Sequence, residues 1–121
     1  MSRQHHEYIK QGVINANPSI ATLIGIEAEF ERHYISVVFF TDDTYSTPVM
    51  VSTMAGTVDV SASDNGIQFG SLVNGEIALG SDSYLRPSVQ GTIRSLRMDF
   101  SGITTLNGAN NYRIYLNSHR G

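Results

Sequence analysis

The chain has 121 residues and no cysteine, which fits one domain with a single core and excludes disulfide bonds and thiolate metal sites. Apolar residues make up 40% of the sequence, whereas charged residues make up only 16%, less than the usual share of about 25%. This composition is typical of strands joined by tight turns, and no apolar run is long enough to span a membrane. The net charge of −3 is the sum of −7 for residues 1–85 and +4 for residues 86–121.

Residues 1–19 are predicted to form an extended N-terminal arm ahead of one domain that spans residues 20–121. Glycine, asparagine and proline interrupt this stretch, and its apolar residues follow no sustained period. Terminal segments of this kind are ordered only when something ties them down. We therefore expect disorder in the free protein and, around residues 5–9, a short strand or turn once the arm docks. The stretch also lacks the apolar region of a signal peptide.

From Ala21 the chain alternates apolar and acidic side chains, which is the pattern of a half-buried strand. The inward set predicted by this alternation is Ile24, Ile26, Ala28 and Phe30. The acidic set on the opposite face is Glu27, Glu29 and Glu31. These carboxylates form either a solvated face or a docking stripe for the arginines of a neighbour. We expect a break or bulge at Arg32-His33, with His33 a strand-end residue rather than a catalytic base.

A second strand is predicted over residues 34–41, and its apolar end, residues 37–40, indicates coverage on both faces or a position at an interface. A polar loop follows, with Asp42 and Asp43 side by side. Two such carboxylates are compatible with calcium binding or acid/base work. We interpret them as turn caps, because aspartate in a loop commonly accepts hydrogen bonds from the backbone of the next residues.

The rest of the chain shows short strand patterns separated by turn signals. The expected strands are Val49–Thr53, Thr57–Ala62, Ile67–Leu72, Glu76–Leu79, Gly91–Phe100 and Tyr112–Leu116. Turns are expected at Asp64-Asn65-Gly66 and at Asn74-Gly75, and loops over Gly80–Pro87 and Ser101–Asn111. Seven to eight short strands at this spacing predict an all-β fold, a single antiparallel β-sandwich.

Two segments of the chain resemble segments of small β-rich virion proteins of tailed bacteriophages. The first is Val37–Val60, VVFFTDDTYSTPVMVSTMAGTVDV, and the second is Gly91–Leu116, which contains GTIRSLRMDFSGIT and YRIYL. The chain has Asp43-Thr44-Tyr45-Ser46 where that group usually has a glycine after the Thr-Asp pair. The resemblance implies a structural role in a virion and transfers no active site.

No pattern in the sequence indicates catalysis or cofactor binding. Nucleophile elbows, zinc-protease helices and glycine-rich phosphate loops are all missing from it. His5-His6-Glu7 contains metal-ligating residue types, but a good site needs more ligands held rigidly. We therefore predict no catalytic, cofactor-binding or metal residues, and we expect that the protein is not an enzyme.

The residues that we expect at an interface are aromatic, basic or acidic side chains on predicted outward faces and loops, because tyrosine and arginine are enriched where proteins meet. They are Glu27, Glu29, Glu31, Tyr45, Tyr84, Arg94, Arg97, Arg113 and Tyr115. The charge division leaves two interpretations open: the charges pair within one fold, or complementary patches meet between subunits or on a partner. The tyrosines leave a third, a surface for sugar rings.

Together these features predict a head decoration or cement protein that stabilises a phage capsid lattice. Its expected partners are the major capsid protein or another virion protein, and further copies of itself in a homo-oligomer. We expect no nucleic-acid or membrane partner, and a cytoplasmic origin followed by assembly into the virion. The alternatives are a tail, collar or fibre-attachment protein and, in another class, a carbohydrate-binding module.

Overall fold

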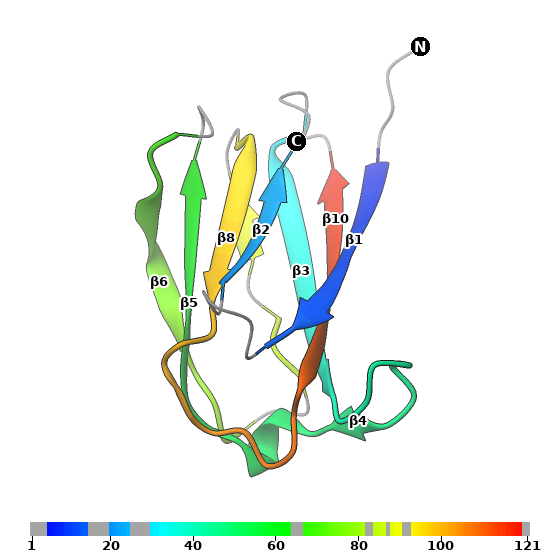
Figure 1. Ribbon diagram of the computed structural model, residues 1–121. Helices are drawn as coiled ribbons and strands as arrows, with labels where there is room; N and C mark the ends of the chain where they lie inside the picture. Colours follow the sequence, from blue (N-terminus) through cyan, green and yellow to red (C-terminus); the bar gives the residue numbers. More distant parts are fainter. Residues whose placement is uncertain are drawn as a thin grey trace.

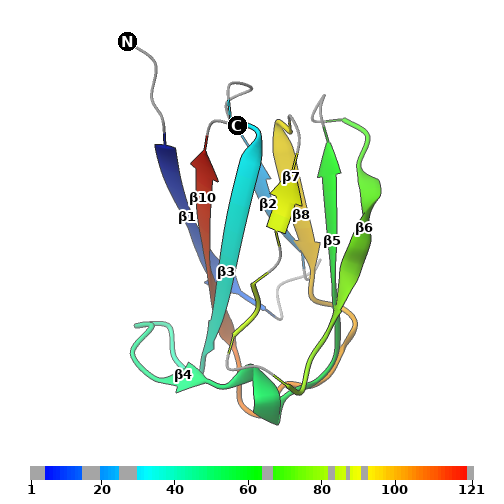
Figure 2. The ribbon, with the colours of Figure 1, turned by 180° about the vertical axis from the view of Figure 1, so that it is seen from behind.

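Two antiparallel β-sheets pack against each other in the computed structural model (Figure 1, Figure 2), which describes residues 5–14, 20–24, 30–63, 67–81, 84–86, 88–90 and 93–119. Sheet A has the order β1-β10-β3-β4, and β7 also pairs with β3. Its strands are β1 (His5–Val13), β10 (Asn111–His119), β3 (Arg32–Phe40), β4 (Pro48–Val49) and β7 (Ser88–Gln90).

Sheet B has the order β2-β8-β5-β6, and β9 also pairs with β5. Its strands are β2 (Ile20–Ile24), β8 (Ser95–Asp99), β5 (Ala55–Ser63), β6 (Gly70–Ala78) and β9 (Ile103–Thr105). Within the described residues the one helical element is a single 3-10 turn, η1 (Val51–Thr53). This arrangement confirms the predicted all-β sandwich, and three of its strands are only two or three residues long.

The core lies between the sheets and is filled by alternate residues of the long strands. Sheet A contributes Ile35, Val37, Phe39, Ile114 and Leu116, and sheet B contributes Val58, Val60, Leu96 and Met98. Phe100, which directly follows β8 of sheet B, reaches across to sheet A, because its ring meets the Phe39 ring at 5.9 Å and the Tyr112 ring at 5.0 Å between centroids. In the strands predicted over Thr57–Ala62, Gly91–Phe100 and Tyr112–Leu116, apolar alternation predicts one inward parity, and the structure confirms it, with Ala62 partly buried at the margin. The inward residues are Val58, Val60, Ala62, Leu96, Met98, Phe100, Tyr112, Ile114 and Leu116.

Residues 5–13, which lie inside the predicted arm, form β1 and pair with β10 along their whole length, from His5 opposite His119 to Val13 opposite Asn111. The strand therefore extends sheet A within the same chain. Its inward positions include Lys10 and Gly12, and Tyr8 packs against the margin of the core. Because these residues do not form an apolar series, the sequence pattern does not indicate a strand here.

The break expected at Arg32-His33 is wrong, because β3 begins at Arg32 and runs without interruption to Phe40. His33 points inward and is 1% exposed, with Nδ1 2.8 Å from Oγ of Ser118 on β10. A buried hydrogen-bonded partner allows a polar side chain to occupy an inward strand position. The alternation of inward and outward side chains along β3 therefore continues through His33, although histidine is polar.

The strand expected over Val49–Thr53 is also wrong. β4 ends at Val49, and Val51–Thr53 turn into η1. The N–H and the hydroxyl of Thr53 both donate to the carbonyl of Met50, at 3.0 and 2.6 Å, and this closes the turn.

The turn expected at Asn74-Gly75 is wrong as well, because β6 continues through both residues. Asp59 pairs with Glu76 whereas Ser61 pairs with Ser71, so residues 72–75 lie opposite Val60. Asn74 and Gly75 therefore lie in a local irregularity of the pairing between β5 and β6, and they do not end the strand. The connection expected over Ser101–Asn111 contains the short strand β9. The turn predicted at residues 64–66 and the strand predicted over residues 25–29 lie outside the described residues.

Candidate functional site

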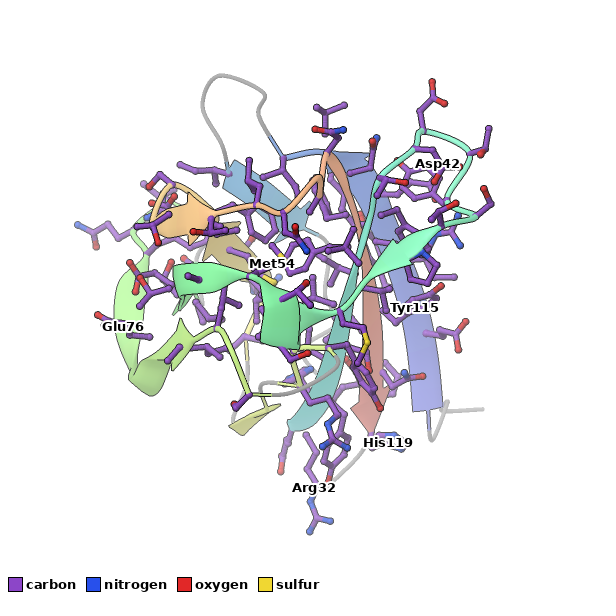
Figure 3. The ribbon with its side chains drawn as sticks, turned by 90° about the horizontal axis from the view of Figure 1, so that it is seen from below. Arg32, Asp42, Met54, Glu76, Tyr115 and His119 are labelled. Atoms are coloured by element: carbon purple, nitrogen blue, oxygen red, sulfur yellow. The ribbon has the colours of Figure 1, made fainter. Side chains whose placement is uncertain are left out.

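The outward side of β1, β10 and β3 forms a broad, sparsely charged surface, which we call the sheet A outer face. Register places its side chains in cross-strand rows, of which two are Ile9–Tyr115–Ser36 and Gln11–Arg113–Val38. Other members are Glu7, Val13, Tyr34 and Asn117, with Arg32 and His119 in the row at one end and Phe40 and Asn111 in the row at the other. Seen along the strands, Tyr115 lies on the opposite side of the molecule from Glu76 of sheet B (Figure 3).

Large apolar side chains are exposed on this face. Ile9 and Val13 on β1 are 51% and 53% exposed, and Tyr34 on β3 is 51% exposed. Isolated exposed apolar residues are common, but three on one sheet face are a feature of interaction surfaces. The ring of Tyr34 meets that of His119 edge-on at 5.5 Å, so its orientation is fixed by packing within the sheet.

The loop that leaves β3, residues 41–47, is closed around one carboxylate, and we call it the Asp42 loop. The hydroxyls of Thr44 and Ser46 donate to Oδ2 of Asp42, and the N–H groups of Ser46 and Thr47 donate to Oδ1 at 3.2 Å. The hydroxyl of Ser46 and then that of Thr44 are the largest causes of the lowered pKa of Asp42. The loop stands clear of the sandwich (Figure 3), and Asp42 is a turn cap, as interpreted from the sequence.

Tyr45 lies in this loop with a φ of 55°, and its ring returns to the sheet. It meets the ring of Phe40 edge-on at 5.4 Å. The guanidinium of Arg113 lies 4.6 Å from the centroid of Tyr45 and 5.7 Å from that of Phe40. The outward apolar end of β3 is therefore covered by its own loop and by an arginine, which explains the unbroken apolar run in the sequence.

Arg113 is held at the centre of the face by hydrogen bonds as well as by the rings. Its Nε donates to Oε1 of Gln11 at 3.0 Å, and its Nη1 donates to the hydroxyl of Tyr115 at 3.4 Å. Two of the five N–H donors of an arginine are used in this way, so others remain for a partner. A guanidinium fixed in place before binding loses little conformational entropy when it meets a carboxylate.

Tyr84 and Arg86 extend the same face beyond β3. Leu85 points inward and exchanges backbone hydrogen bonds with Val37 at 2.9 and 3.2 Å. Alternation at this bridge places Tyr84 and Arg86 on the outward side, and the Arg86 guanidinium lies 5.2 Å from the Tyr84 ring centroid.

The outer face of sheet B is polar. The guanidinium of Arg97 lies 4.5 Å above the ring of Phe69. Three carboxylates occupy one cross-strand row, because Glu76 pairs with Asp59 and Asp59 pairs with Asp99. Oδ1 of Asp99 accepts a hydrogen bond from the N–H of Ser101 at 2.9 Å. Like charges directly opposite each other oppose pairing, so this row reduces stability.

The structure brings together four of the residues predicted at an interface: Tyr45, Tyr84, Arg113 and Tyr115 all lie over sheet A. Arg97 is on the other sheet, and Arg94 is exposed just before β8. Glu31 is exposed next to the start of β3, whereas Glu27 and Glu29 lie outside the described residues.

Sequence reasoning missed the exposed apolar members of this face, Ile9, Val13 and Tyr34. Ile9 and Val13 fall in a segment that was expected to be an arm, and only the pairing with β10 places them beside Tyr115. Tyr34 is the first residue of the second predicted strand, and it alternates with inward Ile35, but the break expected at Arg32-His33 concealed its alternation with inward His33.

Other chemistry is sparse in the part of the chain that the structure describes. No group of three or more His, Asp or Glu side chains there is arranged to hold a metal ion. Within those same ranges no helix is long and apolar enough to cross a membrane. His33 and Ser118 are hydrogen-bonded, but each is 1% exposed, so a substrate would not reach them.

No protein-family model and no curated protein matches the sequence. Among solved structures, the chain is similar to a protein of the disulfide-linked pili that form Bacillus endospore appendages, with 8% identity over 97% of this chain and 88% of that chain and a TM-score of 0.47. The Yersinia pseudotuberculosis-derived mitogen shares 12% identity over 96% and 86%, with a TM-score of 0.43. The Tobacco streak virus coat protein, solved as a dimer, shares 10% over 100% and 89%, also at 0.43. Identities and TM-scores this low establish no common family, ligand or partner.

Proposed function

We propose that the chain is a structural, non-catalytic component of a bacteriophage virion, and within it a head decoration protein that binds the capsid lattice through the sheet A outer face. The observation that carries this function is the chemistry of that face. Exposed Ile9, Val13 and Tyr34 share this face with a fixed arginine, Arg113, and two further tyrosines. Aromatic and arginine anchors with exposed apolar neighbours are the composition of protein-binding surfaces.

The arginine contacts support docking on an acidic partner. In the described part of the chain, the guanidinium groups of Arg86, Arg97 and Arg113 lie over aromatic rings, and no carboxylate pairs with them. Among the residues that the structure describes, no close carboxylate therefore neutralises these three charges. This favours complementary patches between molecules, one of the two interpretations of the charge division, over internal pairing.

The two segments that resemble phage virion proteins contribute part of this face. Val37–Val60 supplies the end of β3 and the Asp42 loop with Tyr45. Gly91–Leu116 supplies the part of β10 that carries Arg113 and Tyr115, as well as β8 and β9 of sheet B. The resemblance therefore includes the fixed arginine and two tyrosines of the face, whereas Ile9, Val13 and Tyr34 lie outside it. It supports a virion role and a virion location after synthesis in the host cytoplasm.

Co-sedimentation with phage heads that lack the protein tests this function. We expect saturable binding that weakens at high salt, since the charged contacts are partly exposed. Arg113→Ala should reduce affinity at least tenfold, about 1.4 kcal/mol. The matched control is Arg97→Ala, which removes an equally stacked arginine from the other sheet and should leave binding unchanged. Thermal melting of both variants checks that each remains folded.

The other outcomes point to the alternatives. If the protein does not bind heads, the tail, collar and fibre-attachment roles come next, and particles lacking those parts are assayed in the same way. If both arginine variants bind equally well, the sheet A outer face is not the contact surface. Glycan affinity of the isolated protein would favour a carbohydrate-binding module. Tyr45 offers little ring surface for a sugar, because Arg113 and Phe40 already cover it.

A further inference from the structure

β1 is an open edge of sheet A. Within the described ranges it pairs with β10 alone, through nine consecutive residues and without a register shift (Figure 1, Figure 2). Long, regular edge strands are templates for pairing with another strand, and natural proteins usually interrupt them with proline, bulges or short lengths. β1 contains no proline and no bulge, and of the devices that protect an edge it carries an inward charge, Lys10, which does not interrupt the strand. It therefore presents an intact strand edge that another strand can extend.

The hydrogen bonds between the other strands of sheet A identify the backbone groups on that edge. The backbone N–H and C=O of Val37 both bond to Leu85, on the side of β3 away from β10. The backbone groups of odd-numbered β3 residues therefore face away from β10, and those of even-numbered residues bond to β10. Through the register, even-numbered residues of β10 bond to even-numbered residues of β1. The N–H of Ile14, which donates to the carbonyl of Asn110 at 2.9 Å, follows this parity. The backbone N–H and C=O groups on the open edge of β1 are therefore those of the odd-numbered residues His5, Glu7, Ile9, Gln11 and Val13.

This edge is complementary to itself in one register. We propose that two copies of the chain join β1 to β1 in antiparallel orientation, about a two-fold axis at Ile9. All nine residues of each strand then pair, and every N–H and C=O on the open edge of β1 forms a hydrogen bond with the second copy. Ile9 lies opposite the second copy's Ile9, next to the Tyr115 of each copy. Glu7 lies opposite the second copy's Gln11, and Lys10 opposite its Tyr8, so no like charges are opposed.

Other registers fit less well. A shift by one residue would pair outer-face residues of one copy with core-facing residues of the other, so the two sandwiches would lie on opposite sides of the joined sheet. Only shifts by two residues keep both cores on the same side. Shifting two residues toward the C-terminus places Lys10 opposite the second copy's Lys10 and leaves His5 and His6 unpaired. Shifting two residues the other way places the Glu7 carboxylate opposite Ile9 and leaves Gly12 and Val13 unpaired. Lys10 and Glu7 therefore select the register centred on Ile9.

The pairing would serve the proposed function without depending on it. A two-fold axis through an antiparallel pair stands perpendicular to the sheet, so both outer faces point to the same side. Two copies would present their Arg113 clusters on one continuous surface and could bind a repeating lattice at two points, which raises overall affinity. Self-association is nevertheless a property of the isolated protein. Its failure and a failure to bind heads are therefore separate results.

Two single-cysteine variants test the pairing, because the chain has no cysteine of its own. Ile9 and Val13 lie on the same strand and the same face, and are 51% and 53% exposed. In the proposed dimer the two Ile9 Cα atoms are about 5.5 Å apart, whereas the two Val13 positions are about 27 Å apart. A short bifunctional thiol reagent should crosslink Ile9→Cys into dimers at least tenfold faster than Val13→Cys. Equal rates, or faster crosslinking of Val13→Cys, would overturn the proposal.

Sedimentation equilibrium of the wild-type chain gives the second measurement. We expect a dimer at about 100 micromolar, a concentration that populates interfaces with micromolar dissociation constants. Ile9→Lys places two ammonium groups opposite each other and should yield a monomer with unchanged circular dichroism. Tyr34→Ser alters the outer face two strands from the edge and should leave the dimer intact. A monomeric wild-type chain, or a dimer lost in Tyr34→Ser but kept in Ile9→Lys, would overturn edge pairing.

Discussion

The outer faces of the two sheets follow the same strand alternation but carry different chemistry. Sheet A exposes Ile9, Val13 and Tyr34 around a fixed arginine, whereas sheet B exposes the carboxylate row Glu76–Asp59–Asp99. Neither surface stabilises an isolated monomer, because exposed apolar side chains and directly opposed like charges are both unfavourable in water. The fold determines which residues point outward, but not what they are. The contrast between the two faces supports the proposal that the sheet A outer face meets a partner.

Both outer faces belong to sheets that pack on one shared hydrophobic core, and Leu96→Ala tests that core. Leu96 on β8 is fully buried, next to outward Arg97. We expect the free energy of unfolding to fall by about 2–5 kcal/mol, since the substitution leaves a cavity between the sheets. Urea denaturation measures the change, and a loss below about 1 kcal/mol would show that β8 does not pack against sheet A.

The inner and outer sides of sheet A differ in how they accommodate polar groups, and a pair of serines tests this difference. Ser118→Ala removes a buried partner of His33 and should reduce stability by about 1–3 kcal/mol. Its control, Ser36→Ala, lies on the outward side of the neighbouring strand and should change stability by less than about 0.5 kcal/mol. If thermal melts show equal shifts for the two variants, the inward assignment of Ser118 is wrong.

Arg97→Glu probes the outer face of sheet B. It removes the stack on Phe69 and adds a carboxylate beside Asp59 and Asp99. We expect a folded protein that is less stable by about 1 kcal/mol, because both changes act at a partly exposed site. Arg97→Gln, which removes the stack without adding charge, should cost less. A variant that unfolds altogether would show that Arg97 points inward.

The smallest expected effect has the opposite sign. Asp59→Asn removes the central charge of the acidic row and should stabilise the isolated protein by about 0.2–1 kcal/mol. The gain should shrink as salt is added, since exposed charges are screened. Asp43→Asn, in the exposed loop on the other side, is the control and should change little. Lower stability of Asp59→Asn at low salt would contradict the view that the row is unfavourable in the monomer.

Local alternation was enough to predict much of the fold. Residues of one parity in β8 and β10 were expected inward, and Leu96, Met98 and Ile114 are buried there. The failures have nonlocal causes. Asn74-Gly75 reads as a turn in isolation, but β6 pairs with β5 on both sides of these residues, and the strand continues through them in the irregularity opposite Val60. β1 lies at the margin of the sandwich, where inward Lys10 does not have to be apolar, so its pattern carries no strand signal.

The candidate site was predictable only residue by residue. Alternation places Arg113 and Tyr115 outward, and loop signals expose Tyr45. Their grouping depends on the register between β3 and β10 and on a loop that closes back over Phe40. These are contacts between distant parts of the chain, and no local pattern encodes them. Arg97 has the same local pattern as Arg113, yet it lies on the opposite sheet.

The Asp42 loop has a consequence for acid tolerance. Hydrogen bonds from Ser46 and Thr44 lower the pKa of Asp42, so the unfolded chain takes up its proton before the folded chain does. The carboxylate therefore contributes its full stabilisation above about pH 4 and loses it only as the pH falls further. The Tyr45 ring resonances should show this as constancy between pH 7 and about pH 5 in the wild type, and Asp42→Asn should remove their shift at lower pH. The Asp42 loop therefore stays closed at a lower pH than it would around an aspartate of ordinary pKa.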